Sequence, residues 1–169
     1  KIGNLVLQSK TLLSIPKEKK NAALVEAIRA GGLRMLGWDE DQWEWQARIM
    51  SLRIWRPNEG WPDVSEENLL ASLEEWLLPY LNEISKQIEL QRLDLPTIVS
   101  GILSWELANK LDTLAPYKLE VPSGSMIKLN YHVDGQAPVM AVRLQEVFGL
   151  LETPTVNNGK MKVMMHLLS

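Results

Sequence analysis

The amino-acid sequence predicts an α+β fold, in which a helical bundle is followed by a small mixed unit with antiparallel strands. Between residue 16 and about residue 115, apolar side chains recur every three or four positions, which places them on one face of a helix. From Pro116 onward, short alternating runs and glycine-containing turns replace that spacing, as in half-buried strands. We therefore divide the chain into a leading segment over 1–15, a helical unit over 16–115 and an α+β unit over 116–169.

Composition is typical of a globular protein in a reducing compartment. The 169 residues are 46% hydrophobic and 23% charged, and they include no cysteine. No apolar run approaches the ~20 residues that a membrane helix needs. The absence of cysteine excludes disulfides and thiolate metal sites. We expect a cytoplasmic protein that does not enter a membrane.

Charge is distributed unevenly along the chain. Residues 1–34 carry seven Lys/Arg against two Glu, residues 39–94 carry five against thirteen acidic residues, and residues 113–169 carry five against four. An acidic surface repels phosphate, so any nucleic-acid contact is expected toward the flanking segments and not over the middle.

The first two helices are expected near residues 22–31 and 40–56. Gly31-Gly32 ends the first, since glycine readily takes the left-handed turn that closes a helix, and Asp39 caps the second, which Pro57 and Gly60 end. Their predicted buried residues are Leu24, Ala27 and Ile28 in the first, and Trp43, Ala47, Met50 and Ile54 in the second.

Two further helices are expected, one after Ser65 and one after Asp94. Ser65 caps a helix over 66–78, with glutamates outward, and Asp94 caps a longer helix that begins with Pro96 and continues to about residue 111. Their predicted inward residues are Leu69, Leu70, Leu73, Trp76 and Leu77, then Ile98, Val99, Ile102, Leu103, Trp105, Leu107 and Leu111.

The α+β unit contains one clear strand and one clear hairpin. In residues 126–133, apolar and polar side chains alternate with the period of two that a strand requires. Asn158-Gly159 lies between residues 153–156 and 160–168 and is a strong hairpin signal. Residues 138–149 begin with proline and end at Gly149, so we predict a short helix there.

Several stretches together resemble the carboxy-terminal region of the HrpB family, bacterial ATP-dependent helicases of the DEAH/RHA group. The most specific are VPSGS at 121–125, AVRLQEVFG at 141–149 and HLLS at 166–169, with supporting stretches from LVLQSK at 5–10 onward. No physical rule demands this combination at these separations. The resemblance implies that residues 1–15 are the tail of a preceding barrel-like domain. It also implies upstream motor domains that bind ATP and magnesium, and a further segment with more strand beyond Ser169.

The motor chemistry itself is absent from these residues. A phosphate-binding loop needs glycines followed by Lys and then Ser or Thr, but the only Gly-Lys, at 159–160, precedes Met161. The acidic cluster at 38–43 reads as a helix cap. His132 and His166 have no partners at metal-ligand spacing. We expect no ATP hydrolysis, cofactor or metal in this chain alone.

The turn at Ser123-Gly124-Ser125 invites three readings: a nucleophile, a phosphate cradle or a plain hairpin. The Gly-x-Ser-x-Gly elbow is not present, and His132 is seven residues from Ser125 along a strand, roughly 20 Å away. Catalysis is therefore disfavoured and a hairpin favoured. A turn whose amides and hydroxyls also hold a phosphate stays open.

Seven tryptophans offer a second possible nucleic-acid contact. We assign Trp43, Trp76 and Trp105 to the core and place Trp38, Trp45, Trp55 and Trp61 at helix edges or loops. Trp55 and Trp61 flank a Pro/Gly loop and could stack on bases, although packing of that loop is the favoured reading.

Two functions are retained. The first is a helicase accessory domain that assists RNA binding or braces the motor domains of the same chain. Its candidate nucleic-acid contacts are Ser123, Gly124, Ser125, Lys128, Arg143, Lys160 and Lys162. Alternation predicts that Lys128 faces outward, and the Asn158-Gly159 hairpin is expected to place Lys160 and Lys162 beside it. The second function is a protein-protein interaction module without nucleic-acid contact.

Overall fold

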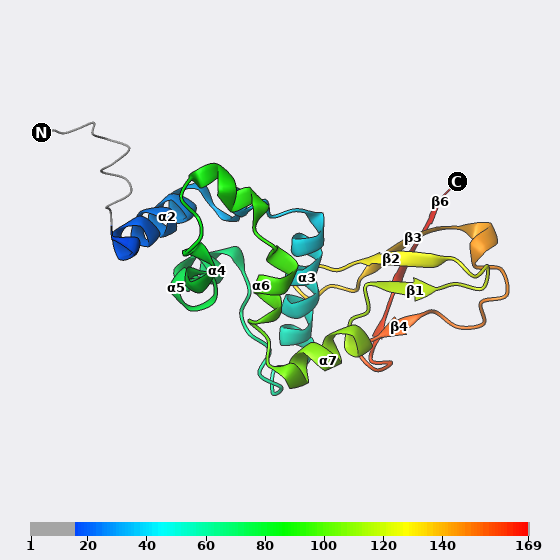
Figure 1. The fold of residues 1–169 in the computed structure, drawn as a ribbon. Helices are drawn as coiled ribbons and strands as arrows, with labels where there is room; N and C mark the ends of the chain where they lie inside the picture. The colour runs from blue at the N-terminus through cyan, green and yellow to red at the C-terminus, as the bar shows by residue number, and fades with distance from the viewer. Residues whose placement is uncertain (1–15, 169) are drawn as a thin grey trace, which may run out of the picture.

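The computed structural model describes residues 16–168 and confirms the α+β class. Helices occupy the chain up to residue 114, and the strands follow (Figure 1). The segment 1–15, predicted to be the tail of a barrel-like domain, lies outside the described residues. No helix of the described part is both long and apolar enough to cross a bilayer.

The first helix ends and the second begins at the predicted signals, although the first starts earlier than the expected residue 22. Helix α2 (Lys17–Gly31) is closed by Gly32 at a φ of 85°, and the 3-10 helix η1 (Leu33–Leu36) follows it. Helix α3 (Glu40–Trp55) is capped by Asp39, whose carboxylate accepts hydrogen bonds from the backbone N–H groups of Asp41 and Gln42. Both caps satisfy backbone groups that a helix end leaves unpaired.

The predicted buried face of α3 is right in part, because Ala47 is buried and Met50 is half-buried against the core, but its two end residues are not buried. Trp43 and Ile54 are exposed, while polar side chains on the other faces are buried. The reason is that α3 lies between the other helices and the sheet, as Figure 1 shows, so it needs hydrogen-bonding groups as well as apolar ones. Its buried residues are Gln42, Glu44, Gln46, Ala47, Arg48, Ile49, Ser51 and Leu52.

The two later predicted helices are each interrupted. The first forms α4 (Glu66–Ala71) and α5 (Leu73–Trp76), separated at Ser72, whose hydroxyl donates to the carbonyl of Asn68 over 2.8 Å. The 3-10 helices η2 (Leu78–Leu81) and η3 (Gln87–Arg92) come next. Ser65 caps α4 as predicted, by accepting from the N–H of Asn68.

The long helix predicted after Asp94 is two short ones, α6 (Leu95–Ser100) and α7 (Trp105–Leu114). Ser104 caps α7 by accepting from the N–H of Leu107 at 3.2 Å, and the chain turns between the helices. Because of this turn, the side chains of α7 do not continue the buried face of α6. Trp105, predicted to lie in the core, is 82% exposed as a result.

The main sheet has the strand order β1-β2-β3-β6. Strands β1 (Lys118–Glu120), β2 (Met126–Asn130) and β3 (Val139–Arg143) pair antiparallel in sequence, and β6 (Met164–Leu168) runs parallel to β3. The helix predicted over 138–149 is therefore wrong. That segment forms β3 and the 3-10 helix η4 (Leu144–Glu146). Met140 and Val142 are its buried residues, at the spacing of a strand.

The predicted Asn158-Gly159 hairpin is confirmed, as a second sheet of two short strands. Strand β4 (Thr155–Val156) pairs with β5 (Met161–Lys162). Asn157, Asn158 and Gly159 all have positive φ, which is the conformation that Asn and Gly tolerate best in such turns. The N–H of Asn157 donates to the carbonyl of Leu114 at 2.7 Å, so the hairpin lies against the end of α7.

One hydrophobic core extends through both parts of the chain. It includes Ile28 and Leu73 among the helices and Leu129 and Met140 in the sheet, all fully buried. Hydrogen bonds from α3 join the two parts at residues 131–135. The far end of the sheet therefore extends from a part of the sheet that is packed against the helices.

Candidate nucleic-acid interface

The turn at Ser123-Gly124-Ser125 is a hairpin connection between β1 and β2. The N–H of Gly124 donates to the carbonyl of Val121 at 2.8 Å, and the N–H of Val121 donates to the carbonyl of Ser125 at 3.0 Å. Gly124 has a φ of 94°, a conformation that side chains disfavour. The N–H of Ser123 donates to the carbonyl of Glu146, so this amide is already paired. The turn retains exposed hydroxyl groups but has fewer free amides than a phosphate cradle uses.

The arrangement gives no support to a serine nucleophile. Ser125 precedes β2 and His132 follows it, so the two side chains lie at opposite ends of the strand. The His132 carbonyl accepts from the hydroxyl of Ser51 at 2.6 Å, which fixes this part of the chain against α3. A nucleophile and its base must instead lie within about 3 Å of each other.

Lys128 contacts a carboxylate of α3 and is not a free cation. Its Nζ lies 2.6 Å from Oε1 of Glu40 and 5.6 Å from the centre of the Tyr117 ring. The hydrogen bond to Glu40, offset in part by burial, raises the pKa of Lys128 above its ordinary value. A phosphate that approached Lys128 would have to compete with this carboxylate.

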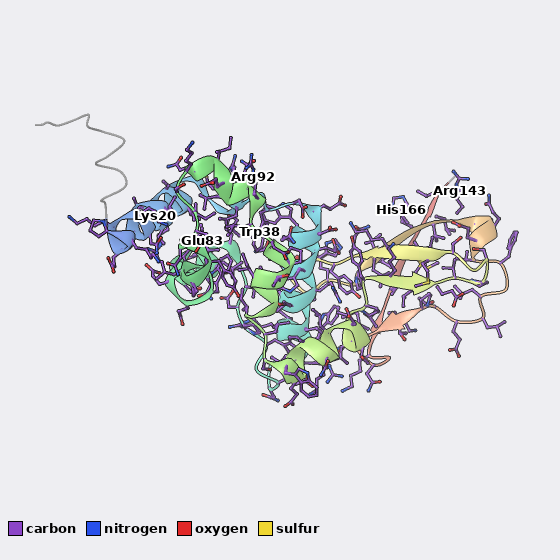
Figure 2. The ribbon with its side chains drawn as sticks, viewed as in Figure 1. Lys20, Trp38, Glu83, Arg92, Arg143 and His166 are labelled. Carbon is purple, nitrogen blue, oxygen red and sulfur yellow. The ribbon has the colours of Figure 1, made fainter. Side chains whose placement is uncertain are left out.

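Arg143, Lys160 and Lys162 are exposed, and among residues 16–168 they form no ion pair. Arg143 ends β3, where Figure 2 shows it near His166 of the neighbouring strand β6. Lys160 lies in the β4–β5 turn and Lys162 ends β5, just before β6 begins.

The expectation that Lys160 and Lys162 lie beside Lys128 is wrong, because β5 pairs with β4 and not with β2. Arg143 pairs with Leu168 while Lys162 precedes Met164, so the two cations are separated by roughly 20 Å of extended chain. The candidate residues therefore form two groups. Arg143 and the Ser123–Ser125 turn lie at the outer end of the sheet, and the two lysines lie near α7.

ATP and magnesium, which the resemblance implies for motor domains, do not fit the residues present here. Gly159-Lys160 lies in a turn between two antiparallel strands, whereas a phosphate-binding loop joins a strand to a helix whose N-terminus faces the phosphate. The residue after Lys160 is Met161, which offers no hydroxyl to a metal ion. We derive no nucleotide chemistry from this chain.

The tryptophans also divide differently from the sequence prediction. Trp76 is buried as predicted, and so are Trp38 and Trp61, which were placed at edges. The Nε1–H of Trp55 donates to the carbonyl of Gly135 at 2.8 Å. Trp55 and Trp61 therefore pack within the fold, the favoured reading of that loop, and do not form a clamp for bases. The tryptophan side chains available at the surface are Trp43 and Trp105.

An exposed apolar group lies next to the sheet and was not predicted. Large apolar side chains of the segment 144–151, which includes η4, face solvent: Leu144, Phe148, Leu150 and Leu151, the last with 95% of its surface exposed. We call these four residues the apolar tip. The sequence did not reveal these residues because residues 138–149 were predicted to form a short helix. Figure 1 shows this segment at the end of the sheet farthest from α2.

Comparison with known proteins gives the class of this domain. A family described as the ATP-dependent helicase C-terminal region matches residues 76–169, more than half of the chain. The fold and the match together define a helicase C-terminal domain.

The chain belongs to the HrpB C-terminal family. The ATP-dependent RNA helicase HrpB of Escherichia coli is 34% identical over 168 residues, which cover 99% of this chain and 21% of that protein. The chain thus spans about a fifth of the length of this relative.

Two solved structures have the same fold. The crystal structure of the E. coli DEAH/RHA helicase HrpB matches with a TM-score of 0.82 and 34% identity, over 92% of this chain and 20% of that one. A crystal structure of the E. coli DExH-box NTPase HrpB matches with a TM-score of 0.85 and 35% identity, over 92% and 19%. Both structural matches cover more of the chain than the family match does, and so they include helices that precede residue 76.

Proposed function

We propose that this chain acts as an accessory domain that adds weak, sequence-independent RNA contacts to an HrpB-type helicase and braces its motor domains. The E. coli relative is named an ATP-dependent RNA helicase, which supplies the class of nucleic acid. The observation that carries the RNA contact is a group of three exposed cations that form no ion pair in the described sheet part: Arg143, Lys160 and Lys162. Lys118 on β1 is a fourth cation of this kind, outside the candidate contacts.

Charge supports contact through the sheet and opposes contact through the helices. Residues 116–168 hold five basic and four acidic side chains, whereas residues 16–115 hold eleven basic and seventeen acidic ones. The cations lie at strand ends and in a turn, and they present no ordered row of base-reading groups. Such contacts neutralise phosphates and do not distinguish bases.

The test is the salt dependence of binding to a labelled oligouridine. Each phosphate contact contributes a slope of about −0.7 in log K against log salt for a single strand. Lys160→Ala with Lys162→Ala should therefore flatten the slope by about 1.4, and Arg143→Ala by about 0.7. The affinity for oligoadenosine should be similar, because no base edge is read.

A matched control variant changes the net charge by the same amount as the Lys160→Ala, Lys162→Ala variant. Lys17→Ala with Lys19→Ala also removes two exposed lysines, but these lie on α2, at the other end of the molecule. This variant should keep the slope of the unchanged chain. If both double variants flatten the slope equally, the binding is only a response to net charge and the proposed interface is wrong.

The protein-interaction function is favoured by a separate observation, the apolar tip. Contiguous exposed apolar groups of this kind mark interaction sites more often than isolated apolar residues do. The probe is the remaining part of the E. coli HrpB chain, supplied separately. Phe148→Ser with Leu151→Ser should weaken its association with this chain. No RNA binding at low salt, together with this loss, would favour a bracing role without RNA contact.

A further inference from the structure

A pocket among α3, α6 and α7 lies outside the interface described above. Figure 1 shows α6 alongside α3, with α7 below them. The pocket has a volume of about 430 Å³, within the ~300–1,000 Å³ that is usual for sites that hold small molecules. It is therefore large enough for a ligand of one or two rings.

The pocket has an apolar side and a polar side. Helices α6 and α7, with the turn between them, supply the apolar side through Val99, Leu103 and Leu111. The opposite side is one face of α3, where lining residues recur at the spacing i, i+3, i+4 and i+7. The α3 side consists of Asp41, Gln42, Glu44, Trp45 and Arg48. A ligand that fills the pocket should be largely apolar, with polar groups along one edge.

The side chain of Gln42 is the observation that points to a ligand. Only 5% of Gln42 is exposed, yet its amide makes no hydrogen bond with any of residues 16–168. The amide is not sealed off, because the enclosed side-chain atom that lacks a partner in residues 16–168 is Oδ1 of Asn21 and not an atom of Gln42. Its accessible surface opens into the pocket that Gln42 lines. Since buried amides are nearly always paired, this free donor and acceptor indicate a missing partner.

Three neighbours of Gln42 also keep hydrogen-bonding atoms without partners in the described part of the chain. Glu44 uses Oε1 to accept a backbone N–H, which leaves Oε2. Arg48 donates from Nε and Nη2 to groups at the end of α7, which leaves Nη1. Nε1 of Trp45 has no partner among residues 16–168 either. The pocket thus offers acceptors and donors side by side along its α3 wall.

The charges around the pocket favour a ligand without phosphate. The side chains of Arg48 and Lys128 are largely covered, whereas their partners Asp112 and Glu40 face solvent. Lys118 is an exposed cation, 6.0 Å from the centre of the tyrosine ring that lines the pocket, but exposed carboxylates outnumber it. A phosphate that entered would meet these carboxylates first, so an uncharged molecule is favoured.

We propose that this pocket binds a free, uncharged nucleobase or nucleoside that carries an amino group on its ring, as adenosine does. A carboxamide such as that of Gln42 has a donor and an acceptor side by side, which match the amino group and the adjacent ring nitrogen of adenine. Oε2 of Glu44 is a second acceptor for the amino group. Nη1 of Arg48 and Nε1 of Trp45 are donors for ring nitrogens. The site goes beyond the proposed RNA contacts, none of whose residues lines the pocket.

The direct test follows the side-chain amide resonance of Gln42 by NMR while adenosine is added to the 169-residue chain. The resonance should shift and saturate, with a dissociation constant on the order of 1 mM for so small a probe. Purine riboside is the same molecule without the amino group, and it should bind at least about three-fold more weakly. An unmoved Gln42 resonance, or equal affinity for the two probes, overturns the proposal.

A second probe distinguishes a free ligand from a base within a strand. Oligoadenosine at the same concentration of bases should leave the Gln42 resonance unmoved, because its phosphates would meet the exposed carboxylates around the pocket. This result is expected whether or not the strand binds at the cations of the sheet. A shift of Gln42 with oligoadenosine that equals or exceeds the shift with adenosine would overturn the assignment to a free ligand.

Two variants of the pocket complete the test. Ala108→Leu adds bulk at an exposed position of α7 that lines the pocket, and it should weaken adenosine binding at least about ten-fold. Ala23→Leu makes the same change at an exposed position of α2 and should have no measurable effect. Equal effects of these two variants would overturn the proposal.

Gln42→Leu keeps most of the side-chain bulk and removes the amide. It should weaken adenosine binding about ten-fold, measured by the shift of the Nε1–H resonance of Trp45. The melting temperature should not fall, because no hydrogen bond of the fold is lost. Unchanged adenosine affinity in this variant would show that the amide does not contact the ligand, and the proposal would be wrong.

Discussion

At the scale of single residues, the stability of this domain depends on polar side chains that α3 buries. Gln46 shows the principle, because its amide accepts from Nε1 of Trp38 and donates to the carbonyl of Val64, both at 2.8 Å. Glu44 accepts from the N–H of Tyr131 at 2.8 Å. Each of these groups satisfies a partner that would otherwise be buried and unpaired, so their removal costs more than the bond itself contributes.

Arg48 gives a measurable case of this asymmetry. It donates to the carbonyl of Ala115 at 2.7 Å and to the carboxylate of Asp112 at 2.6 Å, and its side chain is 10% exposed while that of Asp112 is 86% exposed. Arg48→Met should lower the free energy of unfolding by about 1–3 kcal/mol, because the Ala115 carbonyl loses its partner. Asp112→Asn should cost less than about 1 kcal/mol, because that end of the pair is hydrated. Urea denaturation measures both, and equal losses would show that the exposed bridge matters more than the buried bond.

The residue scale also shows what sequence patterns can and cannot predict. The caps Asp39 and Ser65 were predictable because a cap depends on a few neighbouring backbone groups. The exposure of Trp43 was not predictable, because it depends on which elements surround α3 on each side. A hydrophobic stripe identifies the buried face only where a helix packs on one side.

At the scale of elements, the break between α6 and α7 determines which side chains between residues 98 and 111 are buried. Leu103 lies in the turn and is buried, whereas Trp105 begins α7 and faces solvent. Leu103→Ala should lower the free energy of unfolding by about 2–4 kcal/mol through lost apolar transfer and a residual cavity. Trp105→Ala should change it by less than about 0.5 kcal/mol, since little apolar surface is buried there. If denaturant melts showed a larger loss of unfolding free energy for Trp105→Ala than for Leu103→Ala, the originally predicted single long helix would be supported instead.

Strand β3 shows why the segment 138–149 was assigned to the wrong class. Pro138 at its start and Gly149 at its end are typical helix signals, and Val139 and Val142 have helical spacing. Met140 and Val142 are the side chains that the sheet buries, with Ala141 exposed between them. Pairing on both sides, with β2 and β6, stabilises the strand in a way that local sequence does not record.

Two carboxylates that accept backbone hydrogen bonds make the stability of this fold depend on pH. The N–H of Ser65 lowers the pKa of Asp63, and the N–H groups of Ser85 and Lys86 lower that of Glu89. A pKa that is lower in the folded state contributes stability above its unfolded value, and this is lost as the pH falls through the folded value. The melting temperature should therefore fall from about pH 4.5 downward. The melting temperature of the Glu89→Gln variant should fall less over the same pH range. A melting temperature that stays constant to about pH 3 would contradict the expectation.

At the scale of the whole molecule, the candidate interface was only partly predictable. The sequence suggested candidate cations and a turn, but it could not place these residues relative to one another. Their separation follows from β5 pairing with β4, a choice between distant strands that no short motif specifies. The salt bridge of Lys128 with Glu40 joins residues 88 positions apart and was invisible for the same reason.

The continuous core predicts that the helices and the sheet unfold together. Buried residues of both parts form one cluster, and the hydroxyl of Ser51 on α3 donates to the His132 carbonyl beside the sheet. Hydrogen exchange at the amides of Leu73 and Met140 should then report one midpoint in urea, as expected for a two-state domain.

Ser51→Ala tests this coupling, because it removes a single bond between the two parts. The free energy of unfolding should fall by about 1 kcal/mol, and the amides of Leu73 and Met140 should both move to the same lower urea midpoint. If the sheet and the helices were separate units, only the Met140 amide would respond, and its midpoint would fall below that of Leu73. A shift confined to Met140 would therefore show that the boundary near residue 115 divides two domains that unfold independently.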